Sequence, residues 1–163
     1  MGITCAAVTD NAVESKQGGA RVRVPPPLVF LAAIVIGAFL PGLRVRGPWW
    51  LAAGAALVVA GFLLGLSAMG WFRKTGQDPK PWLPSPELIV QGAYKYTRNP
   101  MYVGMTLLTL GIAALSGRLW IAALAPLALA AVHLLAVLPE ERYLASKFGA
   151  PYLEYKTRVR RYL

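Results

Sequence analysis

The chain of 163 residues is 56% hydrophobic and only 15% charged, which is too apolar for an ordinary soluble domain of this length. Seventeen basic residues stand against seven acidic ones, so the formal net charge is +10. In a soluble protein this charge would favour nucleic acid, but among long apolar segments the positive-inside rule explains it better, and we expect no nucleic-acid partner.

Four apolar blocks indicate helices that cross a membrane. A crossing of about 30 Å of hydrocarbon needs roughly 20 consecutive, mostly apolar residues. The blocks cover residues 24–43, 48–72, 101–116 and 119–138. We therefore expect an all-α integral membrane protein with about four transmembrane helices. The block 101–116 is short for a full crossing, and a re-entrant segment is the alternative.

Proline and glycine residues separate these blocks into two antiparallel hairpins. Three consecutive prolines open the first block at residues 25–27, and Pro-Gly and Gly-Pro pairs bracket a short turn before the second. Gly117 and Arg118 are the only residues between the third and fourth blocks. Gly61 and Gly65 form a GxxxG pair, which lets another helix approach closely in lipid.

The basic residues gather in three segments that four crossings would place on one face of the membrane. Fourteen of the seventeen lie in the N-terminal tail, the connection between the second and third blocks, and the C-terminal segment. The positive-inside rule predicts that this face, with both termini, is cytoplasmic at a cell membrane.

The connection over residues 73–99 and the C-terminal segment are more polar than the blocks. Four prolines between residues 79 and 86 prevent one continuous helix, so the connection lies in the interface or covers a pocket, unless it is a solvent-exposed link without function. At the C-terminus, a stripe of Tyr152, Tyr155, Val159 and Tyr162 at spacings of 3 and 4 predicts an interfacial helix. The one cysteine and the lack of a Cys/His cluster argue against a disulfide framework and a metal site.

The segment 92–104 (GAYKYTRNPMYVG) is the most informative motif. Asn99 is a natural N-cap and Pro100 a first helical residue, and the free N–H groups of such a helix start favour a carboxylate or phosphate. Tyr94 and Tyr102 add aromatic faces suited to a purine or a cation. An ordinary interfacial belt of tyrosine and basic residues is the alternative.

This motif, preceded by the run ELIV at residues 87–90 and followed by PEERYLASKFGAPYLEYKTRV, resembles the isoprenylcysteine carboxyl methyltransferase and phospholipid methyltransferase superfamily. The resemblance covers roughly residues 73–163. From the residues themselves, we expect a flexible cytoplasmic tail over residues 1–23 and an N-terminal transmembrane hairpin over 24–72. The resemblance implies that the region over 73–163, which includes the hairpin 101–138, binds S-adenosylmethionine. By the same resemblance, the cofactor is lined by Glu87, Leu88, Ile89, Val90, Tyr94, Asn99, Pro100, Met101, Tyr102 and Glu140.

Two positions depart from the family pattern, and both bear on the methyl acceptor. Asn99 stands where the prenylcysteine enzymes usually carry histidine, and Ala136 where they carry an arginine for the substrate carboxylate, so prenylcysteine is weakened as the acceptor. A carboxylate nucleophile needs only positioning, whereas an amine must lose a proton, for which His133 and Glu141 are the candidates. A lone histidine in an apolar helix is more often a packing residue.

The sequence therefore favours a membrane methyltransferase that acts on a lipophilic or amphiphilic acceptor in the bilayer. A methyltransferase-like scaffold that has lost catalysis is the first alternative. A small transporter or channel subunit is disfavoured, because the four blocks have neither interior charges nor a repeat between the hairpins. The identity of the acceptor and the oligomeric state stay open.

Overall fold

The computed structural model describes residues 20, 22, 24–42, 44–76, 78, 80, 83 and 85–162, and in these residues every named element is helical. The elements are α2 (Pro26–Phe39), α3 (Pro48–Lys74), η1 (Gly92–Lys95), α4 (Pro100–Ser116), α5 (Leu119–Val132), η2 (His133–Val137), α6 (Leu138–Phe148) and α7 (Ala150–Arg158). The prediction of an all-α chain is confirmed for the described residues.

Two helices are long and apolar enough to cross a membrane: α3, with 27 residues, and the continuous helix Leu119–Phe148, with 30. The helices α2 and α4 are shorter, with 14 and 17 residues. The boundaries of α3 and α4 differ from the predicted ones by at most two residues. The predicted first helix, 24–43, is too long at both ends, because Leu40 is already extended before Pro41 and Pro25 precedes the first helical residue.

The sequence predicts that the fourth helix ends at residue 138, but in the structure it continues through Pro139 to Phe148. Proline has no N–H group to donate within a helix, which normally favours a break or kink. Here the turn before it, η2, widens to a π-helix in which the Leu138 N–H donates to the carbonyl of His133, five residues back. The wider turn accommodates Pro139 without a break in the helix. The helix α6 therefore continues α5 beyond the apolar block.

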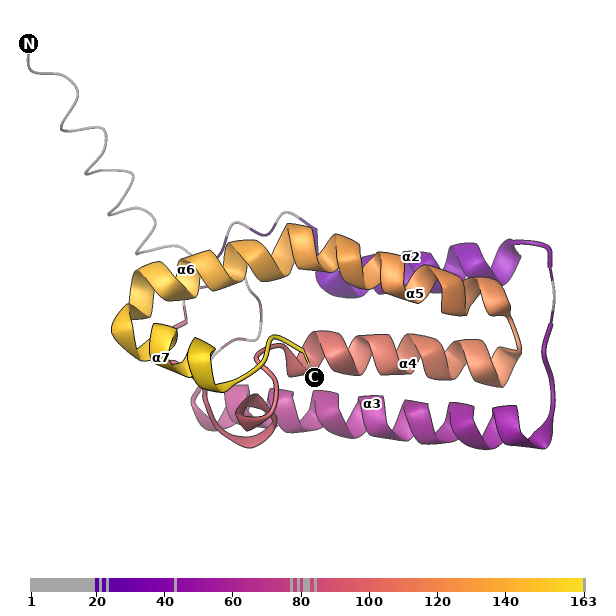
Figure 1. Cartoon of the computed structure of the whole chain (residues 1–163), viewed down its shortest axis with the longest axis horizontal. Coiled ribbons are helices and arrows are strands. Elements are labelled where there is room, and N and C mark those ends of the chain that lie inside the picture. The colour runs from indigo at the N-terminus through magenta and orange to yellow at the C-terminus, as the bar shows by residue number, and fades with distance from the viewer. Residues whose placement is uncertain are drawn as a thin grey trace, which may run out of the picture.

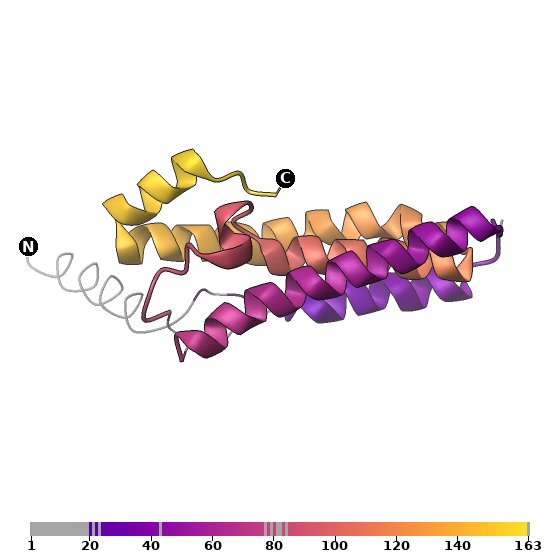
Figure 2. The same cartoon turned by 90° about the horizontal axis from the view of Figure 1, so that it is seen from below.

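The helices lie roughly along one long axis, with α3 beside α4 and α2 beside α5 (Figure 1). The α2–α3 and α4–α5 connections meet at one end of the bundle. At the other end, α7 folds back from α6, and the C-terminus returns towards the start of α4 (Figure 2). The segments that carry the sequence motif are therefore gathered at one end.

Two pairs of glycines bring α3 and α4 into backbone contact. A Cβ atom on Gly61 would lie 2.7 Å from the carbonyl oxygen of Gly104, and one on Gly111 would lie 2.9 Å from the carbonyl oxygen of Gly54. Only glycine, which has no Cβ atom, lets the two helix backbones come this close. The GxxxG prediction is confirmed for Gly61. It is not confirmed for Gly65, because a Cβ atom there would meet nothing within 4 Å.

The core near the motif includes residues from before the first helix. Ala20 and Val22 are buried in one hydrophobic cluster with Phe30 of α2, Tyr102 of α4 and Tyr143 of α6. The predicted flexible tail, 1–23, falls otherwise outside the described residues. At its end, however, the chain packs against the bundle.

Candidate active site

The start of α4 is anchored by a tight approach of the chain to α3. Gly92, the first residue of η1, has φ +61° and lies directly against the indole of Trp71, so a Cβ atom there would clash with the ring. A residue other than glycine would be strained in this backbone conformation as well. The segment from η1 to α4 is thereby fixed to the end of α3.

Asn99 occupies the predicted N-cap position, but its side chain does not cap the helix. Its backbone carbonyl accepts hydrogen bonds from the Tyr102 and Val103 N–H groups, both at 3.1 Å. The side-chain Nδ2 atom instead donates to the carbonyl of Arg161, at 3.0 Å. The residue therefore joins the α4 entry to the C-terminus.

Residues 159–162, which we call the C-terminal strap, run beside this entry. The Arg98 N–H donates to the carbonyl of Arg160 at 3.0 Å, and the Thr97 hydroxyl donates to that of Arg161 at 3.1 Å. The predicted C-terminal helix is too long, because α7 ends at Arg158 and these contacts hold the strap in extended or bent backbone.

Glu141 connects the strap to α6 through a buried cluster of charges. Arg161 donates from Nε and Nη2 to the two carboxylate oxygens, both at 2.9 Å, and Arg98 Nη1 lies 3.1 Å from Oε1. Lys156 Nζ is 3.8 Å from Oε2. Burial by itself raises the pKa of Glu141, but the hydrogen bonds from Arg161 and the charges of Arg98 and Lys156 outweigh it and hold the pKa below its usual value. Glu141 is therefore a fixed anion and a weak base.

Glu140, the neighbouring carboxylate, has a different environment. Its one side-chain partner among the described residues is the Tyr102 hydroxyl, which donates to Oε2 at 3.1 Å. Glu140 follows the apolar block 119–138 and so lies outside the apolar part of its helix. Burial, together with the charge of Glu141, raises the pKa of Glu140 to about 7, against the lowering effect of the Tyr102 hydrogen bond. A carboxylate in this setting favours a cationic partner.

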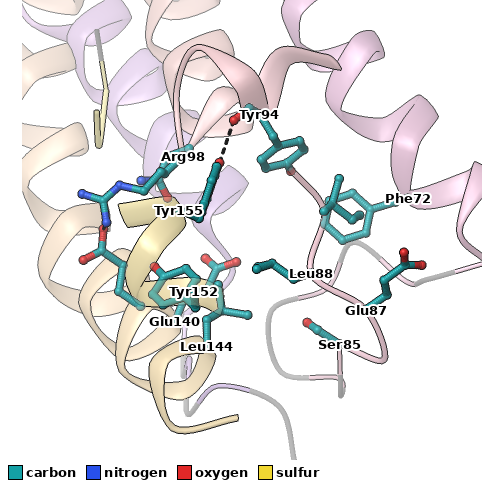
Figure 3. Close-up of a pocket in the computed structure, with 13 residues that line it drawn as sticks. Phe72, Ser85, Glu87, Leu88, Tyr94, Arg98, Glu140, Leu144, Tyr152 and Tyr155 are labelled. Atoms are coloured by element: carbon teal, nitrogen blue, oxygen red, sulfur yellow. Dashed lines mark hydrogen bonds and ion pairs between the residues drawn. The ribbon is translucent and has the colours of Figure 1, made fainter. Parts of the chain in front are cut away.

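A first cavity, of about 60 Å³, opens between α6, α7, η1 and the chain before η1 (Figure 3). Charged and aromatic side chains face it from several elements. Its lining comprises Phe72, Ser85, Glu87, Leu88, Ile89, Tyr94, Arg98, Asn99, Glu140, Glu141, Leu144, Tyr152 and Tyr155.

A second cavity, of about 250 Å³, adjoins the first and is more apolar. The two share Phe72, Tyr94, Arg98, Asn99 and Glu140. The remaining lining of the second comprises Pro25, Pro26, Pro27, Met69, Lys80, Pro100, Met101, Tyr102 and Met105. A polar and an apolar space therefore meet beside the Glu140 carboxylate.

Three tyrosines line the first cavity, and one of them, Tyr94, also belongs to the shared wall. Burial, reinforced by the charge of Glu140, raises the pKa of Tyr94 far above its usual value, and burial and the charge of Glu141 raise that of Tyr152 to about 12. The Tyr155 hydroxyl donates to the Tyr94 carbonyl at 2.7 Å. Tyr94 also meets Phe72 edge to face, with ring centroids 6.2 Å apart.

The structure brings most of the predicted cofactor residues to these two cavities. Glu87, Leu88, Ile89, Tyr94, Asn99 and Glu140 line the first, and Tyr94, Asn99, Pro100, Met101, Tyr102 and Glu140 line the second. Val90 lines neither and is 37% exposed.

The two predicted catalytic residues lie in different settings. Glu141 lines the first cavity but has its carboxylate in the ion pairs described above. His133 lines none of the described cavities, and its Nδ1 atom lies 2.8 Å from the Tyr162 hydroxyl. Their catalytic roles stay predictions.

The sequence did not identify Phe72 and Arg98 of the shared wall as site residues, nor Tyr152 and Tyr155, which line the first cavity alone. Phe72 lies at the end of an apolar block, where nothing in the sequence distinguishes it from other membrane residues, and the positive-inside rule alone accounts for Arg98. Tyr152 and Tyr155 belonged to the recognised stripe, which indicated a buried face without saying what it would meet.

The model of the phospholipid methyltransferase family matches residues 49–151, well over half of the chain. The match begins in α3 and ends at the start of α7, so it includes both glycine pairs, the α4 entry and the two adjacent glutamates. No curated protein and no solved structure matches the chain.

Proposed function

Since the match over residues 49–151 shows that the chain belongs to the phospholipid methyltransferase family, we propose that it transfers a methyl group from S-adenosylmethionine to a membrane-soluble acceptor at the two joined cavities. The observation that carries this proposal is their shared wall at Glu140. A methyl transfer between a polar cofactor and a lipid-like acceptor needs a polar and an apolar space in contact.

The residues present fit the charges of S-adenosylmethionine. The Glu140 carboxylate suits the cationic amino group, because its one described side-chain partner is a neutral hydroxyl. Arg98 suits the carboxylate: its side chain is only 9% exposed, and its Nε atom has no hydrogen-bond partner among the described residues. The Tyr94 and Phe72 rings offer an aromatic wall for the adenine.

The chain's own task in the reaction is alignment. S-adenosylmethionine supplies a methyl group that is already activated by its sulfonium. Tyr102, held on Glu140, fixes one side of the wall, and the apolar lining of the second cavity keeps water from the acceptor. An isoprenylcysteine-like carboxylate would need no proton acceptor, whereas an amine would have to lose its proton.

For an amine acceptor, the setting of each candidate base matters. Glu141 is paired with cations and its pKa is lowered, so we assign it a positioning role in the strap. His133 is held by Tyr162 of the same strap and remains the proposed acceptor of a proton.

We further propose that the acceptor enters from the bilayer between α3 and α4. An apolar groove of about 210 Å³ runs there and shares Met69, Met101 and Met105 with the second cavity. Gly65 lines this groove and faces open space. A chain of methylene groups that lies in the groove would reach the cavity without crossing a polar surface.

All four apolar helices cross the membrane in this proposal, with the site at the cytoplasmic face. The short helices α2 and α4 each lie beside one of the two long helices (Figure 1). Two basic segments that we expect to be cytoplasmic, the connection before α4 and the C-terminal segment, lie at the same end of the bundle as Glu140 (Figure 1), so the cofactor would arrive from the cytosol.

Calorimetric titration of S-adenosylmethionine into the detergent-purified protein tests the proposal. We expect saturable binding that Tyr102→Phe weakens and that Tyr96→Phe leaves unchanged, because Tyr96 is 78% exposed and lines neither cavity. Transfer of radiolabelled methyl groups to lipid amines and to prenylated thiol acids then identifies the acceptor. A folded protein that does not bind the cofactor with or without these acceptors would leave the inactive scaffold as the function.

A further inference from the structure

Two arginines face one another at the end of the bundle opposite Glu140. Arg44, before α3, and Arg118, before α5, form an antiparallel β-bridge, and the adjacent Val45 N–H donates to the Gly117 carbonyl at 2.9 Å. Side chains of residues paired in this way start on the same face, with Cβ atoms about 5 Å apart. The two guanidinium groups therefore extend from one small area.

No acidic residue among those described lies within ion-pair distance of either arginine. Arg118 donates from Nη1 to the Ala38 carbonyl at the end of α2, which uses one of its five donors. Arg44 is exposed. Like charges directly opposite one another are destabilising, so this pair favours an anion between them.

Aromatic residues indicate that the pair lies at the level of lipid headgroups. Trp49 and Phe39 are each 85% exposed, and Trp50 and Trp120 are 47% and 45% exposed. All four lie in or beside the two connections at this end of the bundle. Exposed tryptophans at the end of an apolar bundle are typical of a membrane–water interface, where phosphate groups are the abundant anions.

The surface around the pair has a polar and an apolar cavity side by side. The polar one, of about 310 Å³, is lined by both arginines and by the C-terminal end of α2. The apolar one, of about 190 Å³, lies between α3, α4 and α5 and is lined by Ala53, Leu57, Leu110 and their neighbours. Arg118 and Leu119 line both, so a charged head and an apolar tail would meet there.

We propose that this end of the protein is a binding site for an anionic phospholipid, with the phosphate between Arg44 and Arg118 and one acyl chain in the apolar cavity. The site does not depend on the methyl transfer proposed above, because it lies at the other end of the helices. A net-negative headgroup is favoured over a zwitterionic one, since two guanidinium groups have no described counter-charge.

Native mass spectrometry of the detergent-purified protein tests the site, with dioleoyl phosphatidylglycerol and dioleoyl phosphatidylcholine as probes. We expect one phosphatidylglycerol to bind saturably and in preference to phosphatidylcholine. Arg44→Gln should weaken this binding about tenfold, because it removes charge-assisted hydrogen bonds to the phosphate. Arg46→Gln is the matched control, since it removes the same charge from an exposed residue of the same connection that lines neither cavity.

A second variant tests the acyl chain. Ala53→Phe places a ring in the apolar cavity from an exposed helical position, so it should weaken the binding of the lipid while the fold is retained. Equal losses for Arg44→Gln and Arg46→Gln would mean diffuse charge attraction and overturn the proposal. Equal binding of the two lipids, or protection against thermal unfolding by inorganic phosphate as strong as that by phosphatidylglycerol, would overturn it as well.

Discussion

Glu140 gives the proposed cofactor site a distinct dependence on pH. If its carboxylate holds the cationic amino group of S-adenosylmethionine, the cofactor binds the ionised form, and protonation of Glu140 competes with binding. With a pKa of about 7, that competition falls within an accessible range of pH. An ordinary glutamate, with a pKa of about 4.3, would show no such effect above pH 6.

The size of the effect follows from two ionisations. Glu140 loses its proton at about pH 7. The amino group of the cofactor loses its own at about pH 7.8, the usual value for an α-amine. The affinity should therefore peak near pH 7.4, be roughly sixfold weaker at pH 6 and about seventeenfold weaker at pH 5.5.

Calorimetric titrations between pH 5.5 and 8 measure this profile. Glu140→Gln should lower the affinity at pH 7.4 and remove most of the decline towards acid pH. Glu87→Gln, which alters another carboxylate of the first cavity, should keep the decline. Because a raised pKa means that ionised Glu140 opposes folding, and does so fully above pH 7, the ligand-free Glu140→Gln protein should be at least as thermally stable as wild type at pH 8.

A wild-type affinity that stays constant between pH 6 and pH 7.4 would refute the pairing of Glu140 with the amino group. The same conclusion would follow if Glu140→Gln bound the cofactor as tightly as wild type. A variant that unfolds earlier than wild type at pH 8 would contradict the reasoning about burial.

Three further substitutions, two of them paired with a control substitution, test the packing and the predicted base. Glu141→Gln leaves a buried arginine unpaired and should lower the free energy of unfolding by about 3 to 5 kcal/mol, whereas Glu154→Gln, in an exposed pair, should change it by less than about 1 kcal/mol in the same thermal unfolding assay. Gly61→Leu forces a Cβ atom against backbone and should destabilise by about 3 kcal/mol or more, while Gly65→Ala, which faces open space, should not destabilise. His133→Gln should keep the cofactor affinity of wild type, because the ring lines neither cavity, and a fall in the methyl-transfer rate on the same sample would support its role as a proton acceptor.

The sequence predicts best those features that depend on local chemistry. The boundaries of α3 and α4 follow from apolar length and from proline and glycine at their ends. Asn99 was recognised as an N-cap residue because the pair Asn-Pro is typical of a helix start. These patterns need no knowledge of the rest of the chain.

Features that depend on tertiary contacts could not be predicted in this way. The spacing of Tyr155, Val159 and Tyr162 suits a helix, but Tyr162 reaches His133 and the backbone before it pairs with the α4 entry. These hydrogen bonds join residues more than 25 positions apart, so the helical spacing of the apolar residues cannot predict them. The continuation of the helix through Pro139 is similar, because the π-turn that permits it leaves no mark in the sequence.

The C-terminal strap explains why two adjacent glutamates of one helix have opposite properties. Arg161 of the strap and Arg98 of the α4 entry both lie on Glu141, and their charges keep it ionised. Glu140 points instead towards Tyr102, where no described cation lies on it. If the strap were removed, Glu141 would lose its bidentate partner and Asn99 its carbonyl acceptor. The geometry of the shared wall therefore depends on the strap. Of the two glutamates, Glu140 is the one whose carboxylate has no described cationic partner and can bind a cationic ligand.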